Sequence, residues 1–271
     1  MPVDSGDDDP SASSLNPSDA DGTPSPSPGD RPAQEIARPR AASRSVALLE
    51  VLLCSDYPTQ AVLGTTFAAL GFGAFSPNGQ LRVGFVVALS LLDTVLLVGL
   101  MTFFLYAHGE RPRDVFLGSR PVVPEASYGV PLILVALALA IATLATIQHY
   151  VPSLHTVARN PLQDLIGTPL NAWLFALVVV VAGGIREELQ RAFLLRRFEQ
   201  SLGGTRIGVV VVSLAFGSGH LLQGMDAAVA TGLLGAFWGV VYLRRRSVIA
   251  PIVSHAGFNL LQIGQFLLVG R

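Results

Sequence analysis

Four polar residues in this largely apolar chain are of types that can together hydrolyse an amide. Glu187 lies in the segment GGIREELQRAF, and His220 ends the segment LAFGSGH. His255 and Asn259 both lie in the segment SHAGFN. A glutamate can act as general base on water with the help of a histidine. A second histidine and an asparagine can donate hydrogen bonds to the oxyanion of a tetrahedral intermediate, so this set of side chains favours amide hydrolysis.

The same four residues are predicted to lie at one depth. At about 1.5 Å per helical residue, Glu187 and His255 lie about 13 Å from the arginines at the ends of their segments. His220 and Asn259 lie about 20 Å from the corresponding arginines. A hydrocarbon core is about 30 Å thick, so these values predict one layer well inside a membrane. Charged residues at that depth are costly and are therefore candidates for function.

Further polar and aromatic residues are placed to support this layer. Phe216 lies four residues before the histidine of its own segment and therefore shares its helix face. Glu187 and Arg191 are also four residues apart, which predicts an ion pair between them. Glu188 points about 100° away from Glu187 and is expected to pair with an arginine. Asp93 lies in the middle of another apolar segment, where we expect a structural hydrogen bond rather than a role in the site.

The elements that must position these residues are membrane helices. The chain has 271 residues, of which 51% are hydrophobic and only 14% are charged, against about 25% charged residues in a soluble domain. A helix needs about 20 apolar residues to span a bilayer. We therefore predict an all-α, polytopic membrane helix bundle with about seven (six to eight) transmembrane helices. The predicted spans are about 58–75, 83–107, 129–147, 171–200, 206–222, 226–243 and 248–269, and residues 45–57 are interpreted as an interfacial helix or a part of the first span.

Composition also predicts the domain organisation and the orientation. Residues 1–44 are rich in Asp, Ser and Pro and are expected to form a disordered tail, whereas 45–271 form the transmembrane domain. Arginines gather in every second predicted loop, which places the N-terminus in the cytoplasm. We expect an integral protein of a bacterial cell membrane. The net charge of −1 gives no indication of a nucleic-acid partner, and the single cysteine, Cys54, excludes an internal disulfide.

The three polar segments, taken in order, resemble the motifs of the CPBP family of intramembrane endopeptidases. This family includes the type II CAAX prenyl endopeptidases and bacterial abortive-infection (immunity-type) proteins. EELQR resembles a double glutamate followed by arginine, FGSGH resembles Phe-x-x-x-His, and HAGFN resembles His-x-x-x-Asn. The resemblance covers roughly residues 170–265, the expected protease core. The usual family arginine comes five residues after the first glutamate, whereas Arg191 comes four residues after Glu187.

The resemblance implies a peptidase with defined roles for these residues. Glu187 resembles the catalytic base, and His220 its partner in activating water. His255 and Asn259 resemble the pair that stabilises the oxyanion. The supporting residues implied are Glu188, Arg191 and Phe216. The implied mechanism needs no metal or other cofactor, and the implied substrate is a membrane-embedded or membrane-associated peptide, with a prenylated CAAX-type peptide as the best-known example in the family.

Other interpretations of the same residues stay open. Glu187, His220 and His255 are chemically suited to bind zinc, which would make the protein a metalloprotease. The same fold could instead serve a non-catalytic immunity or scaffold protein that binds a membrane peptide. A transporter with the glutamate and histidines as a proton relay is a third hypothesis, although the sequence shows no internal repeat of the kind that many transporters have.

Overall fold

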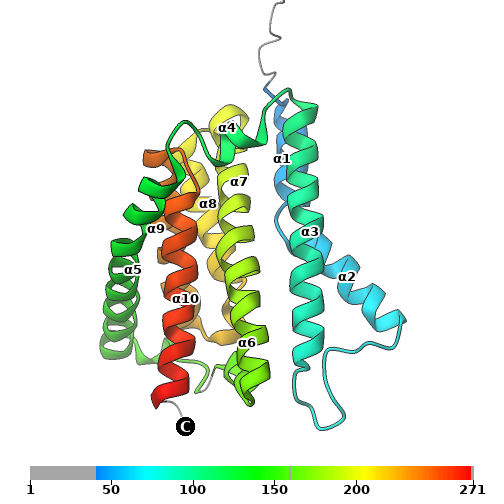
Figure 1. Ribbon diagram of the computed structural model, residues 1–271, viewed down its shortest axis with the longest axis vertical. Helices are drawn as coiled ribbons and strands as arrows, with labels where there is room; N and C mark the ends of the chain where they lie inside the picture. Colours follow the sequence, from blue (N-terminus) through cyan, green and yellow to red (C-terminus); the bar gives the residue numbers. More distant parts are fainter. Residues whose placement is uncertain (1–40, 159, 270–271) are drawn as a thin grey trace, which may run out of the picture. The chain divides into compact units, whose positions relative to one another are not determined.

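The computed structural model describes residues 41–158 and 160–269, which form helices joined by short loops (Figure 1). No β-strand forms within these ranges. The α-helices are α1 (Arg44–Leu53), α2 (Tyr57–Ala69), α3 (Val83–Ala107), α4 (Pro112–Phe116), α5 (Val122–Tyr150), α6 (Pro169–Val178), α7 (Glu187–Ser201), α8 (Thr205–Ser218), α9 (Met225–Arg245) and α10 (Ile249–Val269). The shorter helices are η1 (Pro152–Leu154), η2 (Pro161–Ile166), η3 (Val179–Arg186) and η4 (Leu221–Gln223). The prediction of an all-α fold is confirmed.

Among the residues that the structure describes, four helical segments are long and apolar enough to cross a membrane. They are α3, α5, the continuous segment from Pro169 to Ser201, and α9. Helices α1 and α2 meet at an angle of 41° and make a fifth span if they are counted as one. Each of the seven predicted spans contains a helix, but the first ends at Ala69 and the fifth at Ser218, so both are shorter than predicted. A membrane helix bundle is thus present, with fewer full-length spans than the seven expected.

The predicted tail lies almost entirely outside the described residues. Only residues 41–44 of the predicted tail 1–44 are described, and Arg44 already begins α1. Ser43 precedes this helix, and its hydroxyl accepts a hydrogen bond from the backbone N–H of Val46. This contact is a normal N-terminal cap of α1, and the division into a tail and a transmembrane domain stays a prediction.

The helix that carries the double glutamate contains an unusual segment. The prediction of one long helix from Asn171 to about residue 200 is confirmed, but its middle part, η3, is a π-helix with i→i+5 hydrogen bonds. η3 packs against α10 and ends directly before the double glutamate. A Cβ atom on Gly184 would lie 2.8 Å from the Cβ of Ala256 in α10, so only glycine permits this approach.

Helix α7 is polar in composition yet largely buried, because other helices surround it. It contacts α1, α3, α4, α8 and α9. Figure 1 shows the α6–α7 segment between α10 and α3, and residue contacts join α6 and η3 to both of these helices. The buried residues of α7 include three charged side chains, those of Glu188, Arg191 and Arg197. A buried charge is tolerated only when it is paired, so the partners of these residues determine the packing.

A cluster of charged residues pairs with the arginines in the C-terminal part of α7. Arg197 is fully buried and donates hydrogen bonds to Glu50 and, at 2.5 Å, to Glu110. The Nε atom of Arg196 lies 2.7 Å from Glu110, and the Nε2 atom of His108 lies 2.6 Å from Glu50. Burial alone would raise the pKa of Glu110, but the hydrogen bonds from Arg196 and Arg197 outweigh burial and hold this pKa below the ordinary glutamate value.

Candidate active site

The imidazole of His255 lies between the two carboxylates of the double glutamate. Its Nδ1 atom is 2.8 Å from Oε1 of Glu188, and its Nε2 atom is 3.8 Å from Oε2 of Glu187. Glu188 is almost completely buried, whereas the side chain of Glu187 is 16% exposed. Close packing of η3 on α10 therefore brings together two of the segments that the sequence analysis singled out.

The hydrogen bond to Glu188 fixes the orientation of the histidine ring. An ionised carboxylate only accepts hydrogen bonds, so Nδ1 of His255 is the atom that donates to Glu188. The second nitrogen, Nε2, then faces Glu187 at a distance longer than a hydrogen bond. Both Nε2 of His255 and the carboxylate of Glu187 therefore keep the capacity to bind a third group, such as a water molecule or a substrate atom.

The predicted ion pair between Glu187 and Arg191 is wrong. Arg191 instead forms an ion pair with Glu188, three residues away, and both side chains are buried. Its guanidinium also lies 4.6 Å from the ring centroid of Phe216. Glu187 instead pairs with Arg186, the residue directly before it. The expectation that Glu188 pairs with an arginine is confirmed, and Arg191 reaches it despite its one-residue offset from the family pattern.

An aromatic residue that the sequence analysis did not single out packs against one face of the His255 ring. The indole of Trp238 in α9 stacks on the imidazole with 3.8 Å between ring centroids and 17° between ring planes. The Nε1 atom of Trp238 donates to Ser254 Oγ at 3.1 Å, so the indole is itself fixed. The only sequence signal for this role was a tryptophan inside a predicted membrane span.

His220 lies just beyond the end of α8 and is linked to the site through Phe216. Its Nδ1 atom is 3.0 Å from the carbonyl oxygen of Phe216, and the two rings are 5.0 Å apart. The Phe216 ring also lies edge-on to His255 at 6.1 Å. Because a carbonyl only accepts, Nδ1 of His220 is the donor, which leaves Nε2 free to accept a proton. No hydrogen bond or ion pair in the described part of the chain joins His220 directly to Glu187.

Asn259 lies one helical turn after His255 and faces η3. A Cβ atom on Gly183 would lie 2.9 Å from the Nδ2 atom of Asn259, which shows how closely the amide approaches the π-helix. Gly183 is four residues before Glu187. The structure thus places Glu187, His255 and Asn259 along one seam between η3–α7 and α10, with His220 approaching through Phe216.

A second missed feature is a charged cluster on the other side of Glu187. Arg186 is buried and donates to Asp93 at 2.6 Å and to Glu187 at 3.3 Å, and it forms an ion pair with Asp56. The expected structural hydrogen bond of Asp93 is therefore confirmed. Its partner is the residue next to Glu187, which the spacing of residues in the sequence did not reveal, because Asp56 and Asp93 come from distant segments.

Metal binding can be compared with the same geometry. Among the residues described, no three His, Cys, Asp or Glu side chains converge in a way that could hold a metal ion. His255 uses Nδ1 for Glu188, and His220 uses Nδ1 for a backbone carbonyl. Zinc binding by Glu187, His220 and His255 therefore needs side-chain rearrangement and stays an untested alternative.

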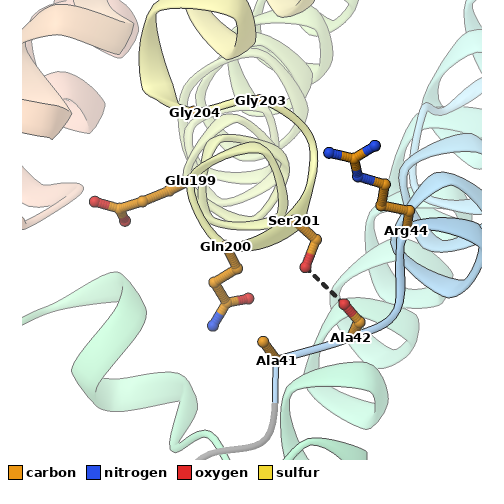
Figure 2. A pocket seen from close by; sticks show the side chains of 8 residues that line it. All are labelled: Ala41, Ala42, Arg44, Glu199, Gln200, Ser201, Gly203 and Gly204. Atoms are coloured by element: carbon orange, nitrogen blue, oxygen red, sulfur yellow. Dashed lines mark hydrogen bonds between the residues drawn. The ribbon is translucent and has the colours of Figure 1, made fainter.

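A surface hollow of about 450 Å³ lies away from these residues (Figure 2). Ala41, Ala42, Arg44, Glu199, Gln200, Ser201, Gly203 and Gly204 line it. Figure 2 shows the hydroxyl of Ser201 directed to the carbonyl oxygen of Ala42, which accepts its hydrogen bond at 2.6 Å. Glu199 is twelve residues after Glu187, or about 18 Å along the helix. The hollow is therefore separate from the cluster of glutamates and histidines.

Comparison with known proteins gives a match to the part of the chain that forms this cluster. A family model described as Rce1-like, type II CAAX prenyl endopeptidase, matches residues 169–261. No curated protein and no solved structure gives a significant match. The matched residues begin at the first residue of α6 and end within α10, so they include all four of the predicted catalytic residues.

Proposed function

We propose that this protein is an intramembrane endopeptidase, because residues 169–261 match the family model described as Rce1-like, type II CAAX prenyl endopeptidase. It hydrolyses a peptide bond of a membrane-associated protein. The observation that carries the proposal is the position of His255 between Glu187 and Glu188, inside the matched segment and within a bundle of apolar helices. A polar site enclosed by apolar helices is the expected setting for hydrolysis near a membrane.

In this proposal Glu187 is the general base. Its carboxylate takes one proton from a water molecule. Nε2 of His220 accepts a hydrogen bond from the same water, which orients the water and helps Glu187 to activate it. The resulting hydroxide attacks the scissile carbonyl carbon, and the carbonyl π electrons move to the oxygen. The proton held by Glu187 passes to the leaving nitrogen when the C–N bond breaks. The products are a carboxylic acid and an amine, so atoms and charges balance.

His255 and Asn259 stabilise the oxyanion of the tetrahedral intermediate. Nε2 of a protonated His255 and the amide of Asn259 are the donors, and Glu188 stabilises the protonated ring through Nδ1. Trp238 holds the ring plane, so little reorganisation is needed as charge develops. Arg191 keeps Glu188 ionised, which assigns this arginine a supporting rather than a reacting role.

The proposal is tested with detergent-purified protein and a library of quenched fluorescent peptides that includes farnesylated CAAX peptides. Wild type, Glu187→Gln and His220→Ala are compared, with Glu199→Gln as a control because Glu199 lies on the same helix at the protein surface. We expect cleavage by wild type and Glu199→Gln and a loss of at least about 100-fold in the other two variants. Equal cleavage by Glu187→Gln would refute the assignment of the base.

The same experiment separates the alternatives. Cleavage that a chelator abolishes and zinc restores would favour a metalloprotease. Folded wild-type protein that binds a peptide without cleaving it would favour a non-catalytic immunity or scaffold protein. Proton movement that depends on Glu187, without peptide cleavage, would favour a carrier.

A further inference from the structure

The turn between α1 and α2 has an unusual backbone conformation. Asp56 has φ 82° and ψ −37°, a region that non-glycine residues rarely adopt. Such a conformation is unfavourable and persists only where its surroundings hold it in place. Here the Asp56 carboxylate accepts a hydrogen bond from Gln60 Nε2 at 2.8 Å, and its backbone oxygen accepts one from the Gln60 N–H at 3.0 Å. A strained residue held this firmly is a reason to look for a function.

Asp56 and the next residue reach two different parts of the site. Asp56 forms an ion pair with Arg186, which immediately precedes Glu187. The hydroxyl of Tyr57 lies 3.0 Å from Ser218 Oγ, two residues before His220. The α1–α2 corner, which we define as Asp56 and Tyr57, therefore connects the end of η3 with the end of α8. Glu187 follows η3 directly, and His220 lies two residues after α8 ends, so the corner is next to both members of the proposed water-activating pair.

Arg186 transmits the position of Asp56 to Glu187. Its guanidinium is buried and is shared by the carboxylates of Asp56, Asp93 and Glu187. The two aspartates come from the corner and from α3, and both contact the Nη1 atom of Arg186. Glu187 accepts a hydrogen bond from the remaining Nη2 at 3.3 Å. Moving either aspartate would therefore move the hydrogen-bond donor next to the proposed base.

We propose that the α1–α2 corner positions the water-activating pair, with Asp56 acting on Glu187 through Arg186 and Tyr57 acting on His220 through Ser218. This inference rests on the proposed endopeptidase function. The corner lies outside the residues that match the family model, so it assigns a role to a part of the chain that the comparison does not cover. Asp56 and Tyr57 are positioning residues, because neither touches the reacting atoms.

Charge distinguishes this role from simple structural support. The charged and titratable groups around Glu187 are Arg186 on its own segment, Asp56 from the corner, Asp93 from α3 and His255 from α10, with His220 beyond Phe216 on the side of α8. Removal of the Asp56 charge leaves the positive charge of Arg186 less compensated. The electrostatic balance beside the proposed base then changes, so the pH–rate profile of the variant should differ from that of wild type.

The first test measures cleavage of a farnesylated CAAX peptide across pH. Asp56→Asn is compared with Asp114→Asn, an exposed aspartate on α4, and Tyr57→Phe with Tyr106→Phe, an exposed tyrosine on α3. We expect Asp56→Asn to lower kcat about tenfold or more and to change the pH profile. Tyr57→Phe should lower kcat with little change in KM or in the pH profile. Asp56→Glu, which retains the charge, should restore the wild-type pH profile.

A second measurement does not depend on peptidase activity. Dicyclohexylcarbodiimide modifies protonated carboxyl groups in apolar surroundings, and mass spectrometry of the full chain quantifies modified Glu187 at each pH. In Asp56→Asn the extent of Glu187 modification should differ from that in wild type, whereas Asp114→Asn should match wild type. If this difference occurs without cleavage by wild type, the corner's influence on Glu187 stands and the proposed function fails.

The opposite result is equally clear. If wild type cleaves the peptide, and Asp56→Asn and Tyr57→Phe match their controls in kcat and in pH profile, the proposed role of the corner is wrong and the peptidase function stands. Thermal unfolding of each variant is measured first. If Asp56→Asn does not fold, Tyr57→Phe, which removes only one hydroxyl, decides the proposal by its kcat.

Discussion

Glu188 is the residue on which the packing of the site depends most. One of its carboxylate oxygens accepts hydrogen bonds from both Arg191 and His255, and the side chain is almost completely buried. The neighbouring Glu187 is more exposed and has no direct hydrogen bond to the histidine. The two consecutive glutamates therefore differ in their surroundings: the buried Glu188 pairs with Arg191 and His255, and the more exposed Glu187 is available for the proposed reaction.

We predict that Glu188→Gln destabilises the protein strongly. The substitution leaves the buried guanidinium of Arg191 without a full negative partner, and breaking a buried ion pair in this way costs about 3–5 kcal/mol. Glu199→Gln breaks only partly exposed ion pairs and should cost about 0–1 kcal/mol. Thermal and denaturant unfolding in detergent measures the difference. Equal stability of the two variants would show that the buried pair contributes little.

At the level of residues, the sequence predicted part of this arrangement. The proximity of Glu187 and His255 and the pairing of Glu188 with an arginine are confirmed. The choice of partner for Arg191 was wrong, because a long arginine side chain can reach residues three or four positions away and spacing alone does not decide between them. The catalytic roles themselves stay predictions until activity is measured.

At the level of elements, the π-helix η3 determines how closely the two halves of the site approach. Its wider turns carry Gly183 and Gly184 against α10, where the side chains of Ala256 and Asn259 leave no room for a Cβ atom. Apolar runs predicted nearly every helix, because hydrophobic length is a strong signal in membrane proteins. The π-helix was not predicted, since its apolar residues fit an ordinary α-helix equally well. The early end of α8 follows from the glycines at 217 and 219, which lower helix propensity.

We predict that Gly184→Val impairs activity more than stability. The larger side chain must push η3 away from Ala256, and overpacking of this kind costs about 1–3 kcal/mol. A displacement of about 1 Å between Glu187 and His255 would lower kcat by about 100-fold. Gly99→Ala in α3 is the matched control, because a Cβ atom there meets nothing within 4 Å. Peptide cleavage and thermal unfolding are measured together, and an active Gly184→Val would contradict the importance of this contact.

At the scale of the whole molecule, charged residues lie close together at the C-terminal ends of α7 and α9 and in the α3–α4 loop. Arg246 pairs with Glu199, Arg120 donates to the backbone oxygen of Arg245, and Arg197 binds Glu50 and Glu110. These contacts show that arginines far apart in the sequence lie at one end of the helices. The sequence predicted this from alternate loops, although the number of full-length spans was smaller than expected.

We predict that this arginine-rich end faces the cytoplasm, because basic residues at helix ends are retained there. Single cysteines introduced at Arg113 and at Ser76, in a Cys54→Ala background, report the two sides. Arg113 lies in α4, beyond the C-terminal end of α3, and Ser76 lies in the loop before the N-terminal end of α3. A membrane-impermeant maleimide applied to intact cells should label position 76 and not position 113. The reverse pattern would contradict the orientation.

We predict that acid weakens the connection between α1, α7 and the α3–α4 loop. The pKa of Glu110 is lower in the folded protein than in the unfolded chain, so its ionised form stabilises the fold above the ordinary glutamate pKa of about 4.3. This contribution is lost as the pH falls through the lower pKa of the folded state. The unfolding temperature should therefore drop below about pH 4.3.

Glu110→Gln isolates this contribution. The variant should be less stable than wild type at pH 7, because Arg196 and Arg197 lose a charged partner. It should also lose less stability on acidification, since the titrating group is absent. Parallel curves for the two proteins between pH 7 and pH 3 would show that Glu110 does not contribute to acid unfolding.

The short helix α8 has a consequence for the surrounding lipid. Its 14 residues extend about 21 Å, which is less than the roughly 30 Å of a typical hydrocarbon core. Such hydrophobic mismatch is relieved when the bilayer thins beside the short element. His220 lies at the end of α8, so thinning brings headgroups and bulk water close to this histidine. If the proposed hydrolysis takes place, its water would then reach this histidine through the thinned bilayer, and lipids with shorter acyl chains would ease its access.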